Sequence, residues 1–330
     1  MQKVLIIRLS SLGDILQCLI SADLIKQEWP QAKIHWLVKK DFSSSLNASL
    51  SIDELHVFDK KTGLIAFVRL VWNLRKQNFT HVYDAHSNLR SHIASWILCL
   101  STNKISFLRR SKQRFKRWLL FTWHYNLLPT PFRGAKSFTA PLEKWGLSDS
   151  VWPKSHITIY ASDKIRNLIQ HKNFILLAPS AAWDLKKWPQ DYWKKLIKLC
   201  DKYFFVIVGG PQDHFCQEIA NSSPSNSINL SGQLNWQETF EAVNEASLVI
   251  SGDTGVLHMA DYIQKPTLAI IGPTAFGYPS SPSSITLEVP LPCRPCTKDG
   301  RGKCKNNTFK KCLIDITPEI VRDKINETMA

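Results

Sequence analysis

A segment suited to anion binding lies in the second half of the chain, Ser251-Gly-Asp-Thr-Gly-Val-Leu-His258. It follows the apolar run Leu248–Ser251 and begins a predicted helix, so the backbone N–H groups of Thr254, Gly255 and Val256 are expected to lack partners within the helix. A helix N-terminus with a glycine that permits close approach is suited to bind a diphosphate. Asp253 is expected to cap this helix or to accept hydrogen bonds from sugar hydroxyls. The alternative is an ordinary capped turn between a strand and a helix.

Two cationic side chains, Lys186 and Lys187, follow another predicted strand, in the segment Ala182–Pro189. The chain has no Asp-x-Asp pair to hold a metal–diphosphate complex, so a cation would have to neutralise a diphosphate leaving group. Either lysine is placed for this task, and the alternative for each is a solvated surface residue. The Gly-x-Gly-x-x-Gly motif after the first strand and the P-loop motif are both missing, which disfavours a dinucleotide-dependent dehydrogenase and a P-loop NTPase.

A carboxylate occupies the corresponding loop of the first half, Ser10-Ser-Leu-Gly-Asp14. Such a group could take a proton from an acceptor hydroxyl as a general base. The alternative for Asp14 is an acidic residue in the first turn of a helix, where it interacts with the helix dipole.

Short apolar runs alternate with helical runs along the whole chain, which indicates βαβ units and parallel sheets, an α/β fold. In the first half we expect strands at 4–9, 34–38 and 81–84, and helices at 15–28, 63–77 and 89–100. In the second half we expect strands at 174–178, 204–208, 248–251 and 267–271 with a short one ending at 229–230. We expect helices at 191–201, at 236–246 and at 255–263, and one that follows Gly209-Gly210-Pro211 and ends at about residue 220.

The length of 330 residues fits two domains of about 150 residues each. A segment with linker composition, residues 147–156, predicts domains at 1–153 and 154–330. Because ligands of such sheets bind outside the carboxyl ends of the strands, we expect a ligand in a cleft between the two domains.

The formal charge of +15 is concentrated in the first half. Residues 1–150 hold 22 Lys and Arg against 10 Asp and Glu, whereas residues 151–330 hold 20 against 17. A field of this sign attracts phosphate-bearing partners, which include nucleic acid, anionic lipid and phosphorylated sugars. No apolar run approaches the roughly 18 residues of a membrane span, and the N-terminal apolar run is too short for a signal peptide. We therefore expect a cytoplasmic protein.

Residues 104–123 join a basic stretch without acids to an aromatic one, Trp118 to Trp123. This composition suits a contact with the surface of a membrane. It equally suits a solvated basic loop that leads into a buried helix.

Four motifs together resemble one family: Arg8–Asp14, Pro179–Pro189 with Trp183, Lys186 and Trp188, Gly209-Gly210-Pro211 followed by Asp213, and Ser251–His258. The combination is similar to the ADP-heptose:lipopolysaccharide heptosyltransferases, glycosyltransferase family 9. The resemblance implies a GT-B architecture, in which two Rossmann-like doubly wound domains face each other across a cleft. It also implies inverting transfer of heptose, with no cofactor needed for catalysis, from ADP-L-glycero-D-manno-heptose to a phosphorylated inner core on lipid A. The partners would be this donor, this acceptor and, peripherally, the cytoplasmic leaflet of the inner membrane; no nucleic acid is expected.

The resemblance carries roles to individual residues. It implies that Asp14 is the general base and that Lys186 contacts the donor phosphates. Ser10, Gly13 and Arg90 would adjoin the acceptor. The segment Asp84-Ala-His86-Ser87-Asn88 departs from the family pattern and leaves the acceptor open. The donor-binding set would comprise Asp253, Thr254, Gly255, Val256, His258, Trp183 and Gly210.

Four cysteines near the C-terminus have the spacing Cys293-x2-Cys296-x7-Cys304-x7-Cys312. They could hold a structural zinc ion, although the second Cys-x2-Cys pair of a zinc ribbon is missing. A disulfide or redox pair, or free thiols, are the alternatives. The other four cysteines are expected in the core, at Cys18, Cys99, Cys200 and Cys216.

Two other functions fit parts of the pattern. One is a glycosyltransferase that uses another nucleotide sugar. The other is a basic nucleic-acid-binding protein with a cysteine-ligated metal, which would bind DNA or RNA with a steep salt dependence but leaves the Asp253-Thr254-Gly255 helix start unexplained.

Overall fold

The computed structural model describes residues 1–100, 104–148, 153–170 and 173–330. The chain forms two compact units. The N-terminal unit comprises residues 1–114 and 135–158, and the C-terminal unit comprises residues 115–134 and 159–330. The sequence predicted one boundary at 153/154, but residues 115–134 group with the C-terminal unit because their apolar side chains pack against Ala275 and Phe276. Residues 149–152 of the predicted linker lie outside the described residues.

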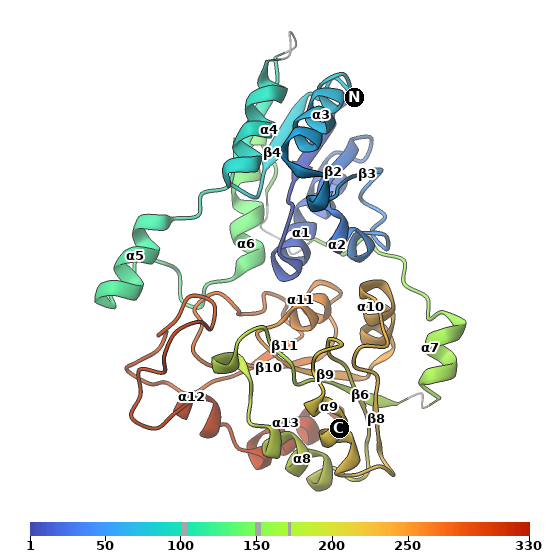
Figure 1. Cartoon of the computed structure of the whole chain (residues 1–330), viewed down its shortest axis with the longest axis vertical. Coiled ribbons are helices and arrows are strands. Elements are labelled where there is room, and N and C mark those ends of the chain that lie inside the picture. Colours follow the sequence, from blue (N-terminus) through green and yellow to red (C-terminus); the bar gives the residue numbers. More distant parts are fainter. Residues whose placement is uncertain (101–103, 149–152, 171–172) are drawn as a thin grey trace. The chain divides into compact units, whose positions relative to one another are not determined.

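The N-terminal unit contains a parallel sheet with the order β3-β2-β1-β4-β5 (Figure 1). Its strands are β1 (Lys3–Ile7), β2 (Lys33–Lys39), β3 (Glu54–Phe58), β4 (His81–Asp84) and β5 (Ser106–Arg109). Its helices are α1 (Leu12–Glu28), α2 (Lys40–Ser43), α3 (Gly63–Arg75) and α4 (Leu89–Cys99), with the short η1 (Ser44–Leu46), η2 (Lys60–Thr62) and η3 (Ala140–Trp145). Helix α6 (Gly134–Thr139) begins at the boundary between the units.

The order of this sheet reverses between β1 and β4, and such a switch point is where open α/β sheets bind ligands. The loops that leave these two strands therefore lie side by side and carry Ser10 and His86. Both inner strands are buried, which explains why their apolar residues were readable as strands from the sequence. Strands β3 and β5 were missed because they lie at the edges of the sheet and carry the polar residues Glu54 and Arg109.

The C-terminal unit contains a parallel sheet with the order β11-β10-β9-β6-β7-β8 (Figure 1). Its strands are β6 (Phe174–Ala178), β7 (Phe204–Ile207), β8 (Ser227–Asn229), β9 (Leu248–Gly252), β10 (Thr267–Ile270) and β11 (Ser284–Leu287). Its helices are α5 (Arg114–Trp123), α7 (Asp163–Leu168), α8 (Gln190–Leu199), α9 (Phe215–Asn221), α10 (Trp236–Glu245), α11 (Gly255–Tyr262), α12 (Lys311–Ile314) and α13 (Pro318–Met329), with the short η4 (Asp184–Lys186). Here the order reverses between β6 and β9, so the loops that carry Lys186 and Asp253 are neighbours.

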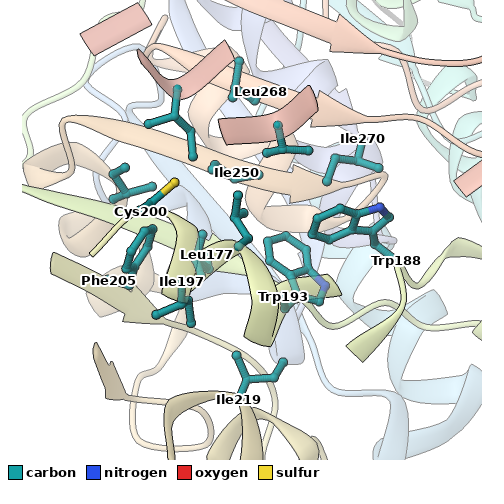
Figure 2. Packing of buried hydrophobic residues seen from close by; sticks show 14 of the residues in the cluster. Leu177, Trp188, Trp193, Ile197, Cys200, Phe205, Ile219, Ile250, Leu268 and Ile270 are labelled. Atoms are coloured by element: carbon teal, nitrogen blue, oxygen red, sulfur yellow. The ribbon is translucent and has the colours of Figure 1, made fainter. Parts of the chain in front are cut away.

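A large apolar core fixes one of these loops. Figure 2 shows Trp193 and Ile197 of α8 beside Leu177, Ile250 and Ile270 of the central strands. Trp188 enters the same cluster and donates a hydrogen bond from Nε1 to the carbonyl of Ile316 at 2.8 Å. Truncating a buried side chain of this size typically costs about 3–5 kcal/mol. The loop before α8 is thus held at its C-terminal end by Trp188.

The two α/β units confirm the predicted fold class. Strand β11 and helix α13 were not predicted; α13 begins at Pro318 with Thr317 as its cap. Cys18, Cys200 and Cys216 are buried as expected, but Cys99 is exposed because it ends α4. Within the described residues, no helix is both long and apolar enough to cross a membrane.

Candidate active site

Lys186 and Asp253 form an ion pair at the switch point of the C-terminal sheet. Nζ of Lys186 lies 2.9 Å from Oδ2 of Asp253, and both side chains are largely buried. Thr274 donates a hydrogen bond to the same Oδ2 at 2.8 Å, and Nε2 of His258 lies 3.7 Å from Oδ1. Three of the predicted residues are therefore brought together, and Thr274 joins them without having been predicted.

The electrostatics of this cluster favour a charged Asp253. Burial by itself would raise the pKa of this carboxyl group. The hydrogen bond from His258 and the charge of Lys186 outweigh burial, so the pKa lies well below its usual range. Asp253 is ionised at any pH at which the protein would act, and it holds the ammonium group of Lys186 in one place.

The start of α11 lies beside this ion pair. Thr254 is the N-cap in an extended conformation, and its hydroxyl lies 2.9 Å from that of Ser251. Residues 253–256 are half-buried, whereas the following residues of α11 are buried. The first N–H groups of a helix have no helical acceptor, so Gly255 and Val256 present donors beside the Lys186 ammonium. This combination can stabilise a diphosphate.

Backbone packing leaves little freedom around the ion pair. A methyl group at Gly277 would overlap the carboxyl group of Asp253. A methyl group at Gly300 would lie 2.7 Å from Cγ and Cδ of Lys186. Both glycines therefore allow backbone to approach the two charged side chains directly, a role that the sequence did not reveal.

Three other candidates lie apart from the ion pair. Gly210 donates its N–H to Asp213 at 2.7 Å, and Ser180 donates to the same carboxylate at 2.5 Å. Trp183 is exposed and packs its Cβ near Gly300, with the guanidinium of Arg301 over its ring. Nζ of Lys187 lies 5.0 Å from the ring centre of Phe215, so of the two lysines Lys186 alone joins Asp253.

Asp14 lies at the switch point of the N-terminal sheet, in the first turn of α1. Its Oδ2 lies 2.6 Å from Nη2 of Arg8 and accepts a hydrogen bond from the hydroxyl of Ser11 at 2.9 Å. Arg8 is buried and donates to the carbonyl of Ala85 at 2.8 Å, so it joins the loops after β1 and β4. Because the Asp14 side chain is 41% exposed, its carboxylate is both oriented and open to a substrate.

Basic groups surround Asp14. Burial and the neighbouring charge of Arg8 lower the pKa of both Arg110 and Lys112. Burial, followed by the charges of Arg8 and Lys112, lowers the pKa of His86 to about 3, so this imidazole is neutral. Arg8, Arg110 and Lys112 were not predicted as site residues from the sequence, although Arg8 and Arg110 each follow a strand.

The remaining acceptor candidates lie at the same edge of the N-terminal sheet. Ser10 is half-buried in the loop after β1, and Gly13 precedes Asp14 in α1. Arg90 lies in the first turn of α4, and its charge, after burial, lowers the pKa of Lys39. The exposed carboxylate of Asp14 thus lies among cations at this edge, an arrangement suited to a hydroxyl acceptor that bears phosphates.

A comparison with protein families decides what this arrangement belongs to. The family described as glycosyltransferase family 9 (heptosyltransferase) matches residues 67–306. The chain belongs to glycosyltransferase family 9. It is also 26% identical over 294 residues to lipopolysaccharide heptosyltransferase 1 of Campylobacter coli, a match that covers 82% of this chain and 84% of that protein.

Solved structures agree with a family 9 glycosyltransferase and its GT-B fold. A family 9 glycosyltransferase from Veillonella parvula has a TM-score of 0.77 at 19% identity, covering 99% of this chain and 97% of that one. ADP-heptose lipopolysaccharide heptosyltransferase II of Escherichia coli has a TM-score of 0.75 at 19% identity, with coverages of 99% and 98%. The E. coli heptosyltransferase WaaC, solved with ADP, has a TM-score of 0.70 at 15% identity, with coverages of 99% and 100%.

The four C-terminal cysteines of this family 9 enzyme line one small pocket of about 10 Å³. Three of their sulfurs accept hydrogen bonds: Cys304 from the N–H of Lys310 at 3.4 Å, Cys293 from Asn306 at 3.6 Å, and Cys296 from the N–H of Lys305. Three potential metal-ligand atoms from His, Cys, Asp or Glu side chains lie within 4.8 Å of one another at only one place among the described residues, at His35, Glu54 and His56. The cysteines do not form such a set. The thiols therefore share a pocket without the spacing of a closed metal centre.

Proposed function

We propose that this enzyme transfers heptose from ADP-heptose to the inner core of lipopolysaccharide, with inversion at the anomeric carbon. The observation that carries the proposal is the Lys186–Asp253 ion pair beside the open N-terminus of α11. Membership of the family supports the choice of donor, and so does the ADP with which the E. coli relative WaaC was solved. The half-exposed Asp14 among cations supports a phosphorylated acceptor.

In the proposed reaction, Asp14 takes the proton from an acceptor hydroxyl as the oxygen attacks the anomeric carbon. The bond between that carbon and the diphosphate breaks, and ADP leaves from the opposite face. Negative charge then develops on the diphosphate, where Lys186 and the N–H groups of Gly255 and Val256 stabilise it. Asp253, with His258, positions Lys186. Lys186 supplies positive charge where other glycosyltransferases use a metal held by an Asp-x-Asp pair, so we propose that the transfer step needs no metal.

The remaining predicted residues take supporting roles in this proposal. Thr254 shapes the loop before α11, while Trp183 and Gly210 border the donor from the loops after β6 and β7. Ser10, Gly13 and Arg90 adjoin the acceptor. The acceptor is anchored through lipid A, so we propose that the enzyme works peripherally at the cytoplasmic leaflet of the inner membrane.

The decisive experiment incubates the protein with ADP-heptose and a series of truncated lipopolysaccharides, and weighs the products by mass spectrometry. We expect one truncated acceptor to gain a single heptose, with an anomeric configuration opposite to that of the donor by NMR. ADP should compete with the donor better than UDP or GDP does. Transfer from a UDP- or GDP-sugar instead would contradict the proposed donor, and no transfer to any acceptor would contradict the proposed reaction.

We also propose that Cys293, Cys296, Cys304 and Cys312 bind a structural zinc ion. Four thiols around one pocket with N–H donors to their sulfurs are a donor set that zinc accepts, and their sulfurs would have to move closer together to bind one ion. The ion would fix the loop whose Gly300 covers Lys186. Freshly purified, reduced protein should contain one zinc per chain by elemental analysis, and the Cys293→Ser/Cys296→Ser variant should contain none. Wild-type protein without bound zinc would contradict this proposal, and the four cysteines would then be free thiols or form a disulfide.

A further inference from the structure

Helix α5 is anchored through one face only. Leu120 is buried, and the ring of Phe121 meets Phe276 at 5.9 Å between centroids. Together with Leu128 and Phe132, Leu120 and Phe121 form a small apolar cluster within the C-terminal unit. These contacts fix the orientation of the helix on the C-terminal unit, and so they fix the direction in which its other face points.

The other face of α5 exposes large aromatic side chains. Phe115, Trp118 and Trp123 are 68%, 50% and 67% exposed. Their rings pack on one another, with centroids 6.1 Å apart for Phe115 and Trp118 and 5.2 Å apart for Trp118 and Trp123. Tyr125 and Leu127, just after the helix, are also exposed. We call these five residues the aromatic patch; a contiguous exposed apolar patch of this kind marks an interaction surface.

The sequence around the aromatic patch is basic. Between Asp84 and Glu143 the sequence has ten lysines and arginines and no acidic residue. Two of these cations, Arg114 and Lys116, are exposed on α5 itself. Aromatic side chains with neighbouring cations are what the headgroup region of an anionic bilayer binds, because rings enter the interface while cations meet lipid phosphates.

This chemistry favours a lipid surface over single-stranded nucleic acid. A strand of nucleic acid needs ring faces that stand open for successive bases. In the aromatic patch, Phe115 and Trp123 both pack against Trp118. A continuous apolar surface suits insertion among lipid headgroups better than base stacking.

We propose that the aromatic patch, with Arg114 and Lys116, docks this enzyme onto an anionic lipid bilayer. The inference deepens the proposed function, on which it rests for the lipid-anchored acceptor. Docking by α5 would keep the enzyme on the leaflet that holds its acceptor.

The test uses the full-length protein and vesicles without lipopolysaccharide. Flotation with phosphatidylcholine vesicles is compared with flotation with vesicles that also contain phosphatidylglycerol. We expect binding to the anionic vesicles that weakens with salt. The triple variant Phe115→Ser/Trp118→Ser/Trp123→Ser should lose at least tenfold in partitioning. Replacing Arg114 and Lys116 by Gln should cost about fivefold for each charge on anionic vesicles alone.

A matched control separates the aromatic patch from exposed aromatics in general. Trp96 on α4 is 67% exposed, and Trp96→Ser should bind vesicles as the wild type does. Unchanged binding by the triple variant, or no binding by the wild type, would overturn the proposal. The proposal would also be overturned if the wild type were a dimer and the triple variant a monomer. It would likewise be overturned if the triple variant lost nucleic-acid binding but still bound vesicles.

Transfer to a soluble acceptor separates this inference from the proposed function. With a deacylated core oligosaccharide, the triple variant should transfer heptose at the wild-type rate. If the wild type transfers heptose but does not bind anionic vesicles, the docking proposal alone fails. If vesicles are bound but no acceptor is modified, the proposed function alone fails.

Discussion

Nζ of Lys186 lies 2.9 Å from Oδ2 of Asp253, and the backbone of Gly300 covers the stem of the same lysine. The ammonium group is therefore held from two sides, by the loop after β9 and by the cysteine-containing loop. Breaking a buried ion pair by removing one partner leaves an uncompensated charge, which typically costs about 3–5 kcal/mol. A fixed cation next to a helix N-terminus needs little rearrangement as charge develops on a leaving diphosphate.

Lys186→Ala should lower heptose transfer by about 10²–10³, because it removes one stabilising group from the proposed leaving diphosphate. Lys187→Ala is the matched control, since Lys187 lies over Phe215 and outside the ion pair. The rates are measured under saturating acceptor, with ADP affinity measured separately by calorimetry. If both variants lose activity equally, the charge of the loop matters and the position of Lys186 does not.

Asp14→Ala should lower transfer by about 10²–10⁴, the usual contribution of a general base, while ADP binding stays within a few-fold of the wild type. Asp41→Asn, at an exposed acid of α2, should leave both quantities unchanged. Transfer by Asp14→Ala within a few-fold of the wild-type rate would remove Asp14 from the mechanism. Combining Asp14→Ala with Lys186→Ala should cost less than the product of the two single effects if both act in one step.

Gly277→Ala should destabilise the protein by about 1–3 kcal/mol, as overpacking commonly does, because the new methyl group would overlap the carboxyl group of Asp253. The free energy of unfolding is obtained from urea denaturation. The double variant Gly277→Ala/Asp253→Gly tests the cause, because it removes the overlapping atoms. Its destabilisation should be smaller than the sum of the two single effects, and strict additivity would show that the overlap is not the reason.

The stability of the N-terminal unit should fall as the pH drops from about 6.5 to 4. Burial, opposed in part by Glu54, lowers the pKa of His35 from 6.5 to about 4, and burial also lowers that of His56. The folded state thus prefers the neutral imidazole. The contribution of His35 to the free energy of unfolding is therefore complete above the unfolded pKa of 6.5, and it is lost as the pH falls to about 4. For His35 the loss is on the order of 3 kcal/mol.

Urea denaturation at pH 7.5 and pH 4.5 checks this dependence. His35→Gln keeps a polar partner for His56, which lies 2.9 Å from His35, and should flatten the difference between the two pH values. His124→Gln, at an exposed histidine after α5, is the control and should retain the wild-type difference. An equal pH dependence in wild type and His35→Gln would exclude the His35 titration as the cause.

Local patterns could single out those parts of the candidate site that lie within a single strand–loop–helix segment. The strand before Asp253 and the helix after Thr254 are adjacent in sequence, so their apolar residues and glycine were enough to place them. The partners of these residues come from elsewhere in the chain: Thr274 and Gly277 reach Asp253 from the loop after β10, and Gly300 reaches Lys186. Such contacts depend on strand order and packing, which no local pattern encodes.

The same limit applies in the N-terminal unit. Asp14 was predicted from its loop, but the buried Arg8 that binds it is held by Ala85, 77 residues away. Edge strands β3 and β5 escaped prediction because they carry charged residues and one side of each is open. Local patterns were therefore enough for the central strands and the motif residues, but they left out the cations around Asp14.

The assignment of residues 115–134 to the C-terminal unit has a practical consequence for anyone who divides this protein. The polypeptide crosses between the units three times, near residues 114, 134 and 158. A fragment that begins at residue 159 would lack Leu120, Leu128 and Phe132, and would leave Phe276 uncovered. Halves that are expressed separately would therefore each expose an apolar surface. To isolate the proposed nucleotide-sugar-binding unit, a better fragment would join residues 115–134 to residue 159 through a short loop.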